Sequence, residues 1–216
     1  MSEKILVTGC AGFIGMHLCK TLLNKGYNIF GVDNLNSYYS VKLKKERLDI
    51  LLLHSNFEFE KIDITNYLSL KKIIELFSPS KIVNLAAQAG VRHSIKDPHI
   101  FIKSNIAGFM NILELSRYNN IEGLIYASSS SVYGEKSILP FSEDQNINSP
   151  ISIYAVSKIA NEHMARTYSS LFGLRTTGLR FFTVYGPWGR PDMAIYKFTE
   201  KILSNKSISV YNHGNV

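Results

Sequence analysis

Cysteine and long apolar runs are both scarce in this sequence. The chain has 2 cysteines, Cys10 and Cys19, which are too few and too close together for a disulfide framework, and neither lies in a CxxC motif. No apolar run approaches the roughly 18 residues that a membrane-spanning helix needs. The opening MSEKILVTG also lacks the pattern of a signal peptide. These absences predict a cytoplasmic protein without membrane association.

Metal-ligand spacing and the mononucleotide-binding motif are missing as well. The 6 histidines form no HxxxH pair and do not cluster with the cysteines, so we expect no metal site. The phosphate-binding motif GxxxxGK[ST] is absent. The formal net charge of +7 is compatible with nucleic-acid binding, but it suits a small anionic substrate equally well. The one dense basic cluster, KLKKER at 42–47, is interpreted as a solvated helix face, and no nucleic-acid partner is expected.

Short β-branched runs alternate along the chain with longer segments of helical spacing. The runs lie at residues 5–8, 28–32, 57–62, 81–85, 124–127 and 177–182, and the helical segments include 12–25, 67–77, 99–119 and 153–171. Strands that alternate with helices predict an α/β fold with a doubly wound parallel sheet, covered by helices on both faces. In such folds the ligand binds beyond the carboxyl ends of the strands.

Three glycines follow the first predicted strand in VTGCAGFIG. Gly9, Gly12 and Gly15 have GxxGxxG spacing and lie between a strand and a helix. Glycine lets the backbone approach a pyrophosphate, which then meets the unpaired N–H groups of the helix N-terminus. A glycine triplet alone is also compatible with simple turn chemistry. Its place in the first βαβ unit favours a dinucleotide site.

An aspartate ends the second predicted strand, 18 residues after Gly15. The carboxylate of Asp33 can accept both hydroxyls of an adenosine ribose and would repel a 2′-phosphate. Neither Asn34 nor its neighbours supply an arginine for that phosphate, so we predict NAD as the cofactor instead of NADP. Asp63, after the third predicted strand, has two equal interpretations: it caps a turn, or it lines the adenine pocket.

Three tyrosine–lysine pairs have the spacing of one helical turn, and they are Tyr38–Lys42, Tyr67–Lys71 and Tyr154–Lys158. The first two fall in the half of the sheet that should hold the adenosine. The third begins the helix after the fifth strand, with Ser149–Pro150 as its start signal, so both side chains should point into one cavity. The alternative for Tyr154 is an ordinary tyrosine at a helix interface.

The pair at 154 and 158 has the composition of an acid–base site. A phenol acts as a base at neutral pH only if its pKa falls by about three from a value near 10, which corresponds to roughly 4 kcal/mol. The ammonium of Lys158 and the positive nicotinamide ring of NAD are natural sources of that stabilisation. Lys158 can also hydrogen-bond the nicotinamide ribose. The serine run at 128–131 offers a hydroxyl to complete the site.

Several segments are similar to those of a known family. TGCAGFIG, the serine-rich strand end followed by VYG, and YAVSK resemble the extended short-chain dehydrogenase/reductase family, and VDNLNSYY, NLAAQAGVRHS, YASSSSVYG and LRFFTVYGPWGRPDM resemble its UDP-glucuronate 4-epimerases. The resemblance implies a Rossmann-like fold, with Tyr154 as base, Lys158 as its partner and Ser129 as hydroxyl relay. The predicted cofactor-binding residues are Gly9, Gly12, Phe13, Ile14, Gly15, Asp33, Asn34, Asp63, Ile64, Ala86, Ala87 and Lys158.

The resemblance also implies a reaction, the interconversion of UDP-glucuronate and UDP-galacturonate through a 4-keto intermediate. Thr183 and Arg190 match family positions that contact the substrate or its carboxylate, for which an arginine fork is suited. Ser130 and Arg92 are further substrate candidates, with a structural salt bridge as an equal alternative for Arg92. Sugar-nucleotide dehydratases carry an Asp–Glu pair where this chain has Ser130 and Ser131, which disfavours elimination. UDP-glucuronate decarboxylase shares the first oxidation step and stays open as an alternative.

Family members are much longer than this chain of 216 residues. We therefore expect residues 1–182 to form the NAD-binding domain with the catalytic residues, and 183–216 to form only the start of a smaller substrate-binding lobe, with a strand at 208–210. Such a chain should bind NAD but show little or no epimerase activity. The resemblance implies a homodimer through helices 99–119 and 153–171. A non-catalytic NAD-binding module is the second functional hypothesis.

Overall fold

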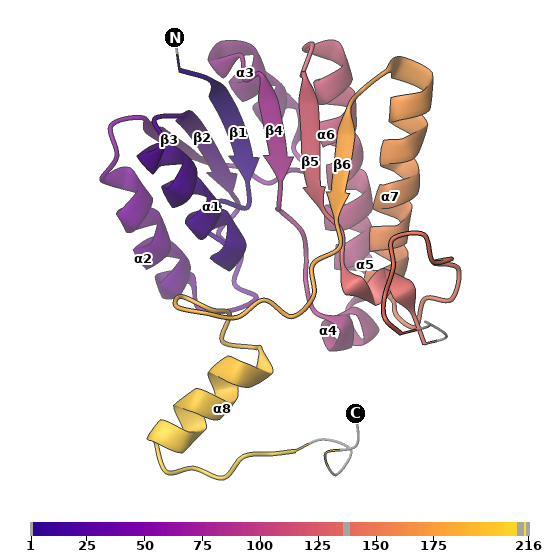
Figure 1. Cartoon of the computed structure of the whole chain (residues 1–216). Coiled ribbons are helices and arrows are strands. Elements are labelled where there is room, and N and C mark those ends of the chain that lie inside the picture. Colours follow the sequence, from indigo (N-terminus) through magenta and orange to yellow (C-terminus); the bar gives the residue numbers. More distant parts are fainter. Residues whose placement is uncertain (1, 136–138, 211–213, 215–216) are drawn as a thin grey trace.

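Six parallel strands form one sheet in the computed structural model, which describes residues 2–135, 139–210 and 214 (Figure 1). The strand order is β3-β2-β1-β4-β5-β6, and every pair of neighbours is parallel. This order confirms the predicted doubly wound α/β fold. The strands are β1 (Lys4–Thr8), β2 (Asn28–Asp33), β3 (Phe57–Lys61), β4 (Lys81–Asn84), β5 (Gly123–Ala127) and β6 (Thr176–Leu179).

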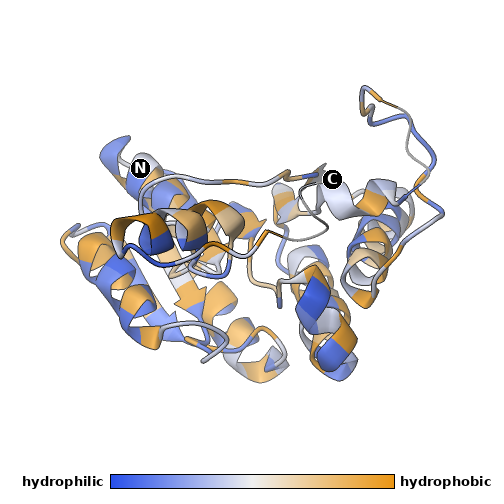
Figure 2. Cartoon of the chain, turned by 90° about the horizontal axis from the view of Figure 1, so that it is seen from below, coloured by the Kyte–Doolittle hydropathy of each residue, from blue (hydrophilic) through white to orange (hydrophobic). Residues whose placement is uncertain are grey.

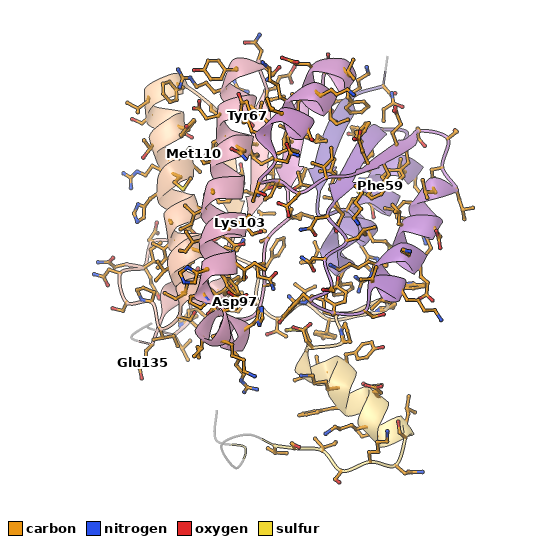
Figure 3. The ribbon with its side chains drawn as sticks, turned by 180° about the vertical axis from the view of Figure 1, so that it is seen from behind. Phe59, Tyr67, Asp97, Lys103, Met110 and Glu135 are labelled. Carbon is orange, nitrogen blue, oxygen red and sulfur yellow. The ribbon has the colours of Figure 1, made fainter. Side chains whose placement is uncertain are left out.

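Helices cover both faces of the sheet, as Figures 1 and 3 show from opposite sides. One face carries α1 (Phe13–Asn24) and α2 (Val41–Leu52). The opposite face carries α3 (Tyr67–Phe77), α6 (Gly108–Tyr118) and α7 (Ile153–Phe172). The remaining helical segments are α4 (Val91–Lys96), α5 (Pro98–Phe101), the π-helix η1 (Ile102–Ala107), the 3-10 helix η2 (Ser130–Tyr133) and α8 (Ala194–Leu203).

Two apolar cores, one on each face, hold these layers together. The core under α1 and α2 contains Ile5 and Val7 of β1, and the core under α3 and α6 contains Leu6 of the same strand. These three residues are at most 5% exposed, so β1 is buried on both faces. Burial on both faces explains why the centre of β1, ILV within KILVT, is continuously apolar and not alternating.

The chain leaves the sheet earlier than the sequence predicts. The strand expected at 177–182 is observed at Thr176–Leu179, and the strand expected at 208–210 is wrong because these residues form no strand. Instead, the segment after β6 contains α8, which has no buried residue and stands clear of the sheet in Figures 1 and 3. The boundary at residue 182 between an NAD-binding domain and a substrate-binding lobe stays a prediction.

The long helix predicted at 99–119 is interrupted by one wide turn, η1. The buried Asn105 in this turn donates its amide to the Gln88 carbonyl at 3.0 Å and to the Ser157 hydroxyl at 3.0 Å. The Asn105 carbonyl accepts the side-chain amide of Asn161 at 2.7 Å. A π-turn widens the ladder of backbone hydrogen bonds, and this carbonyl is thereby open to α7. The turn thus fastens the loop after β4 to α7.

Within the described ranges, no helix is both long and apolar enough to cross a membrane.

Candidate active site

One large cavity of about 930 Å³ opens at the carboxyl ends of the strands. It is lined by loops that follow β1, β2, β3, β4 and β5 and by residues of the segment after β6. Every predicted site residue except Asp63 lines it, and these residues are Gly9, Gly12, Phe13, Ile14, Gly15, Asp33, Asn34, Ile64, Ala86, Ala87, Arg92, Ser129, Ser130, Tyr154, Lys158, Thr183 and Arg190. The structure therefore gathers them in one place, while their individual roles stay predictions.

The glycine-rich loop has no room for side chains. Gly9 has a φ of +72°, and a Cβ there would lie 2.7 Å from the backbone nitrogen of Ala86. A Cβ on Gly15 would lie 2.1 Å from the Gly9 carbonyl oxygen. Gly12 is the N-cap of α1, and it has no side chain that could accept a hydrogen bond from the first N–H groups of the helix. No capping side chain therefore competes with a ligand for these N–H groups. This cradle fits a pyrophosphate.

Asp33 lies at the end of β2, on the wall of the cavity, with 7% of its surface exposed. Its Oδ1 accepts the backbone N–H of Leu35 at 2.8 Å. Burial raises the pKa of Asp33, while the Leu35 N–H and the charges of Lys44 and Arg47 act in the opposite direction. The carboxylate is thus held in a fixed orientation beside the cavity.

Asp63 caps a turn, and it is not among the residues that line the cavity. Its Oδ1 accepts the backbone N–H of Thr65 at 2.9 Å and the Thr65 hydroxyl at 2.7 Å. Its Oδ2 accepts the side-chain amide of Asn34 at 2.8 Å. Of the two interpretations offered for Asp63, the geometry favours the turn cap, which also orients Asn34 on the cavity wall.

The basic cluster at 42–47 is not simply a solvated helix face, and that interpretation was wrong for two of its residues. Lys44 and Arg47 of α2 are 5% and 0% exposed. Lys44 Nζ donates to the Asn36 carbonyl at 2.9 Å and to Asn36 Oδ1 at 2.8 Å. Lys44 is covered by the loop that precedes α2, whereas Arg47 is covered by segments distant in the sequence, which contain Ala11 and Trp188.

Tyr154 and Lys158 lie on one side of the first turns of α7. The helix begins at Ile153, and its N-cap is Ser152, whose hydroxyl accepts the Ala155 N–H at 3.0 Å, so the predicted start at 149–150 is corrected. Lys158 Nζ lies 6.0 Å from the centre of the Tyr154 ring and donates to the Ala127 carbonyl at 2.8 Å. A strand end thereby fixes the lysine.

Burial governs the ionisation of this pair. It lowers the pKa of Lys158 to about 8. It also raises the pKa of Tyr154, against the lowering effects of a hydrogen bond with the Ser129 side chain and of the Arg190 charge. The expected fall in the pKa of the phenol is therefore not present in the chain by itself. An additional positive charge beside the ring is required for Tyr154 to act as a base near neutral pH.

The three tyrosine–lysine pairs separate clearly in the structure. The Lys42 and Lys71 side chains are 85% and 48% exposed, and each lies within 4.0 Å of a glutamate one turn further along its helix. Lys158 is 4% exposed. Of the three lysines, only the one after Tyr154 borders the cavity at the strand ends. Position in the fold distinguishes the pairs, as predicted.

Arg190 borders the cavity but already holds a carboxylate of the chain itself. Its Nε donates to Asp192 Oδ1 at 3.0 Å and its Nη2 to Asp192 Oδ2 at 2.5 Å. Asp192 Oδ2 also accepts the Tyr38 hydroxyl at 3.2 Å. The sequence predictions did not include Tyr38 or Asp192, although the close spacing of Arg190 and Asp192 is a signal for such an ion pair.

The other three predicted substrate contacts occupy different parts of the cavity wall. Ser130 begins η2, and its backbone N–H donates to the Phe181 carbonyl at 2.8 Å. Thr183 lies just beyond β6 and is exposed. Arg92 lies on α4 and is also exposed. These three residues line the cavity from different elements.

A second network that the sequence predictions missed lies behind the serine run. Glu162, one turn after Lys158, accepts from Arg180 Nε at 3.0 Å and from Arg180 Nη2 at 2.9 Å. It also accepts the Ser128 hydroxyl. The two charged side chains are 16% and 17% exposed. This ion pair fastens α7 to the ends of β5 and β6, next to Ser129.

Among residues 2–135, 139–210 and 214, no group of three or more His, Cys, Asp or Glu side chains could hold a metal ion.

Comparisons with known proteins agree on one family. A family model described as the NAD dependent epimerase/dehydratase family matches residues 5–216. Protein CapI of Staphylococcus aureus is 58% identical over 213 residues, which are 99% of this chain and 64% of that protein. UDP-glucuronate 4-epimerase 2 of Arabidopsis thaliana is 47% identical over an alignment 217 residues long, which covers 99% of this chain and 50% of that protein.

Solved structures give the same result. The UDP-glucuronic acid 4-epimerase from Bacillus cereus, in complex with UDP-glucuronic acid and NAD, superimposes with a TM-score of 0.92 and is 39% identical. The match covers 98% of this chain and 67% of that one. This chain thus spans between 50% and 67% of the length of these three proteins.

Proposed function

This chain belongs to the NAD-dependent epimerase/dehydratase family, and we propose that it binds NAD and carries the acid–base residues for epimerisation of UDP-glucuronate at carbon 4, with UDP-galacturonate as product. One observation carries the proposal. Tyr154, Lys158 and Ser129 border the same cavity as the glycine-rich loop and Asp33. The similarity to proteins named UDP-glucuronate 4-epimerase supports this choice of sugar nucleotide.

The residues on the cavity wall fit a dinucleotide in one orientation. The glycine-rich loop and the uncapped N-terminus of α1 would hold the pyrophosphate. Asp33 would accept the hydroxyls of the adenosine ribose, and Lys158 would donate to the ribose on the nicotinamide side. When bound, NAD supplies the acceptor for the hydride from carbon 4 and a positive ring. This orientation leaves Tyr154 on the side where the sugar enters.

Tyr154 then removes the proton of the sugar hydroxyl and later returns it. In the chain alone burial raises the pKa of the phenol, so Tyr154 is protonated at neutral pH. The Ser129 side chain lowers that pKa by hydrogen bonding to the phenol and offers a path for the proton. Lys158, with a pKa of about 8, is largely charged at pH 7 and adds the nearby cation.

Arg190, Thr183 and Ser130 would face the sugar, with Arg92 as a further candidate. Because Arg190 binds Asp192 through both Nε and Nη2, a substrate carboxylate would have to replace or share that contact. Holding the carboxylate in a fixed orientation matters chemically, since a 4-keto glucuronate is a β-keto acid that can lose carbon dioxide. The epimerase outcome depends on that restraint.

We also propose that residues 183–216 contribute to a substrate-binding lobe and that two chains pair through α6 and α7. Exposed apolar side chains on these helices support the pairing, among them Met110, Tyr118, Val156 and Phe172. Met110 of α6 lies beside α7 (Figure 3), where the Tyr168 hydroxyl donates to its sulfur at 3.2 Å. A cytoplasmic location stays a prediction of the sequence.

The test is incubation of the chain with NAD and UDP-glucuronate, with the products identified by NMR. We expect saturable NAD binding and UDP-galacturonate as the product, formed slowly because much of the segment after β6 is exposed. The variant Tyr154→Phe, which keeps the ring and loses the hydroxyl, should bind NAD and give no product. It is the matched control.

Two other results would change the assignment. A UDP-pentose would identify a decarboxylase, the alternative that shares the first oxidation. Saturated NAD with no product under any condition would contradict catalysis by this chain and leave a NAD-binding module.

A further inference from the structure

The segment after β6 crosses the molecule from the catalytic half to the cofactor half. We call residues 183–193 the crossing segment. In Figure 1 it runs below the carboxyl ends of the strands from β6 toward α1 and α2. His17 Nε2 of α1 hydrogen-bonds the Pro187 carbonyl at 2.9 Å, and Tyr38 donates to Asp192 at 3.2 Å. The crossing segment therefore lies against the elements that hold the glycine-rich loop.

Arg47 of α2 is the central contact between these parts. It is 0% exposed and is one of the largest fully buried side chains of the described chain. Its Nη2 donates to the Trp188 carbonyl at 2.6 Å and to the Gly189 carbonyl at 3.2 Å. Its Nη1 donates to the Ala11 carbonyl at 3.2 Å and to the Tyr39 hydroxyl at 2.7 Å. One guanidinium thus joins the glycine-rich loop to a turn that lies 141 residues after Arg47 in the chain.

The turn that Arg47 holds has an unfavourable backbone. Trp188 has a φ of +64° and Gly186 a φ of +148°. A bulky residue with positive φ is uncommon and needs stabilising contacts from its surroundings. Within the turn, the Gly189 N–H donates to the Gly186 carbonyl at 3.1 Å. The two carbonyls that Arg47 binds belong to Trp188 and to the residue after it, so this side chain supports the strained conformation directly.

Arg190 follows this turn immediately, and its position depends on it. Arg190 and Tyr154 line the same cavity, and the Arg190 charge acts to lower the pKa of the Tyr154 phenol. Packing alone does not explain why an arginine is buried at position 47. An apolar side chain would fill the same space beside α2 without the cost of burying a guanidinium. Among the described residues, Arg47 Nε is the buried side-chain nitrogen or oxygen without a hydrogen-bond partner. The orientation of Arg47 thus lets Nη1 and Nη2 donate hydrogen bonds and leaves Nε without one.

We propose that Arg47 is a positioning residue that holds the 186–189 turn, and with it Arg190, against the glycine-rich loop, so that the cofactor site and the substrate-facing arginine are mechanically coupled. The part of this inference that concerns NAD rests on the proposed function. The coupling itself is a property of the chain and can be measured without a ligand.

The test is hydrogen–deuterium exchange of the full chain, with Arg47→Lys as the variant. Lysine keeps the charge but loses the planar fork, so it cannot bind the loop and the turn together. Without ligand, we expect exchange of the 186–193 amides to be at least about tenfold faster in Arg47→Lys than in the unmodified chain. With saturating NAD, exchange in the glycine-rich loop should slow in both proteins, and exchange in 186–193 should slow only in the unmodified chain.

Leu51→Ala is the matched control, because Leu51 is also buried on α2 at 0% exposure but belongs to the apolar core. It should destabilise the fold and still let NAD slow exchange in 186–193. Unchanged exchange of 186–193 in Arg47→Lys would overturn the inference, and so would an equal loss of coupling in Leu51→Ala. Failure of the unmodified chain to bind NAD would contradict the proposed function, while the ligand-free comparison would still decide the role of Arg47.

Discussion

The centre of the sheet and its β6 edge differ in how many of their faces are covered. In β1, four of the five residues are buried, because helices pack on both faces. In β5 the burial alternates, with Leu124 and Tyr126 buried toward α6 and Ile125 between them half-buried. In β6 three of the four residues are exposed. Figure 1 shows α1 and α2 in front of β1 to β3 and no described helix in front of β5 and β6.

The helices repeat this difference. α1 and α2 each bury four or more residues, whereas α8 buries none. Viewed onto the carboxyl ends of the strands in Figure 2, hydrophobic and hydrophilic residues alternate along the helical surfaces. The cofactor side is therefore built and fixed by its own core, while the segment after β6 is held through a few polar contacts. The proposed activities should separate in the same way, with cofactor binding robust and substrate handling weak.

The largest expected effect compares the core with α8. Leu113→Ala, at a residue 0% exposed in α6, should lower the free energy of unfolding by about 2–5 kcal/mol, since it leaves a cavity. Leu203→Ala, at a residue 81% exposed in α8, should change it by less than about 0.5 kcal/mol. Urea unfolding followed by circular dichroism measures both. A comparable loss in the α8 variant would show that this helix is packed in solution.

A second comparison concerns two glycines. Gly15→Ala should reduce NAD affinity by at least about 100-fold, or about 2.7 kcal/mol, because its Cβ would lie 2.1 Å from the Gly9 carbonyl. Gly123→Ala, where no atom lies within 4 Å of the added Cβ, should leave the affinity unchanged. Isothermal titration calorimetry with NAD is the measurement. Equal affinities in the two variants would contradict the assignment of the loop to the cofactor.

The buried lysine should limit stability in a pH-dependent way. The pKa of Lys158 is about 8 in the folded chain and 10.5 ordinarily, so the unfolded chain binds more protons between these values. Stability should therefore rise as the pH increases from 8 to 10.5, by roughly 3–4 kcal/mol from this group. Below pH 8 the lysine is charged in both states and the full cost of burial is present.

Lys158→Met should consequently be more stable than the unmodified chain at pH 7. The increase in stability that the lysine causes above pH 8 should be absent from this variant. Lys42→Met, at a side chain 85% exposed, is the control and should change neither. Melting temperatures across this pH range give the answer. Loss of stability in Lys158→Met at pH 7 would mean that its bond to the Ala127 carbonyl outweighs the cost of burial.

The smallest effect concerns the ion pair that fastens the end of β6. Arg180→Met should lower the free energy of unfolding by about 2 kcal/mol. It removes the partner of Glu162, whose side chain is only 16% exposed. Lys71→Met removes a surface pair with side chains 48% and 53% exposed and should cost about 0.3 kcal/mol. Chemical denaturation of both variants tests the difference. Equal costs would show that the polar contacts near β6 carry no special weight.

The features that the sequence predicted depend on local pattern. The strand positions, the glycine-rich loop, Asp33 and the Tyr154–Lys158 pair follow from residue spacing and from the order of strands and helices. The errors depend on distant contacts. Arg47 was assigned to a solvated face, yet it is buried by Trp188 and Gly189, which no local pattern connects to α2.

Other differences have equally non-local causes. The wide turn at η1 exists because Asn105 bonds to the loop after β4 and to α7 at once. The end of β6 at Leu179 and the absence of a strand at 208–210 depend on pairing partners, which apolar spacing alone does not reveal. Likewise, the raised pKa of Tyr154 reflects its burial, which could not be judged from the sequence.

The most direct measurement is a crystal structure of the chain with NAD. We expect the adenosine ribose at Asp33, the pyrophosphate at the glycine-rich loop, and the nicotinamide ribose within hydrogen-bond distance of Lys158, about 2.6–3.2 Å. The Tyr154 hydroxyl would then face the nicotinamide ring. NAD bound elsewhere, or bound with its nicotinamide at the Asp33 end, would contradict the assignment of this cavity.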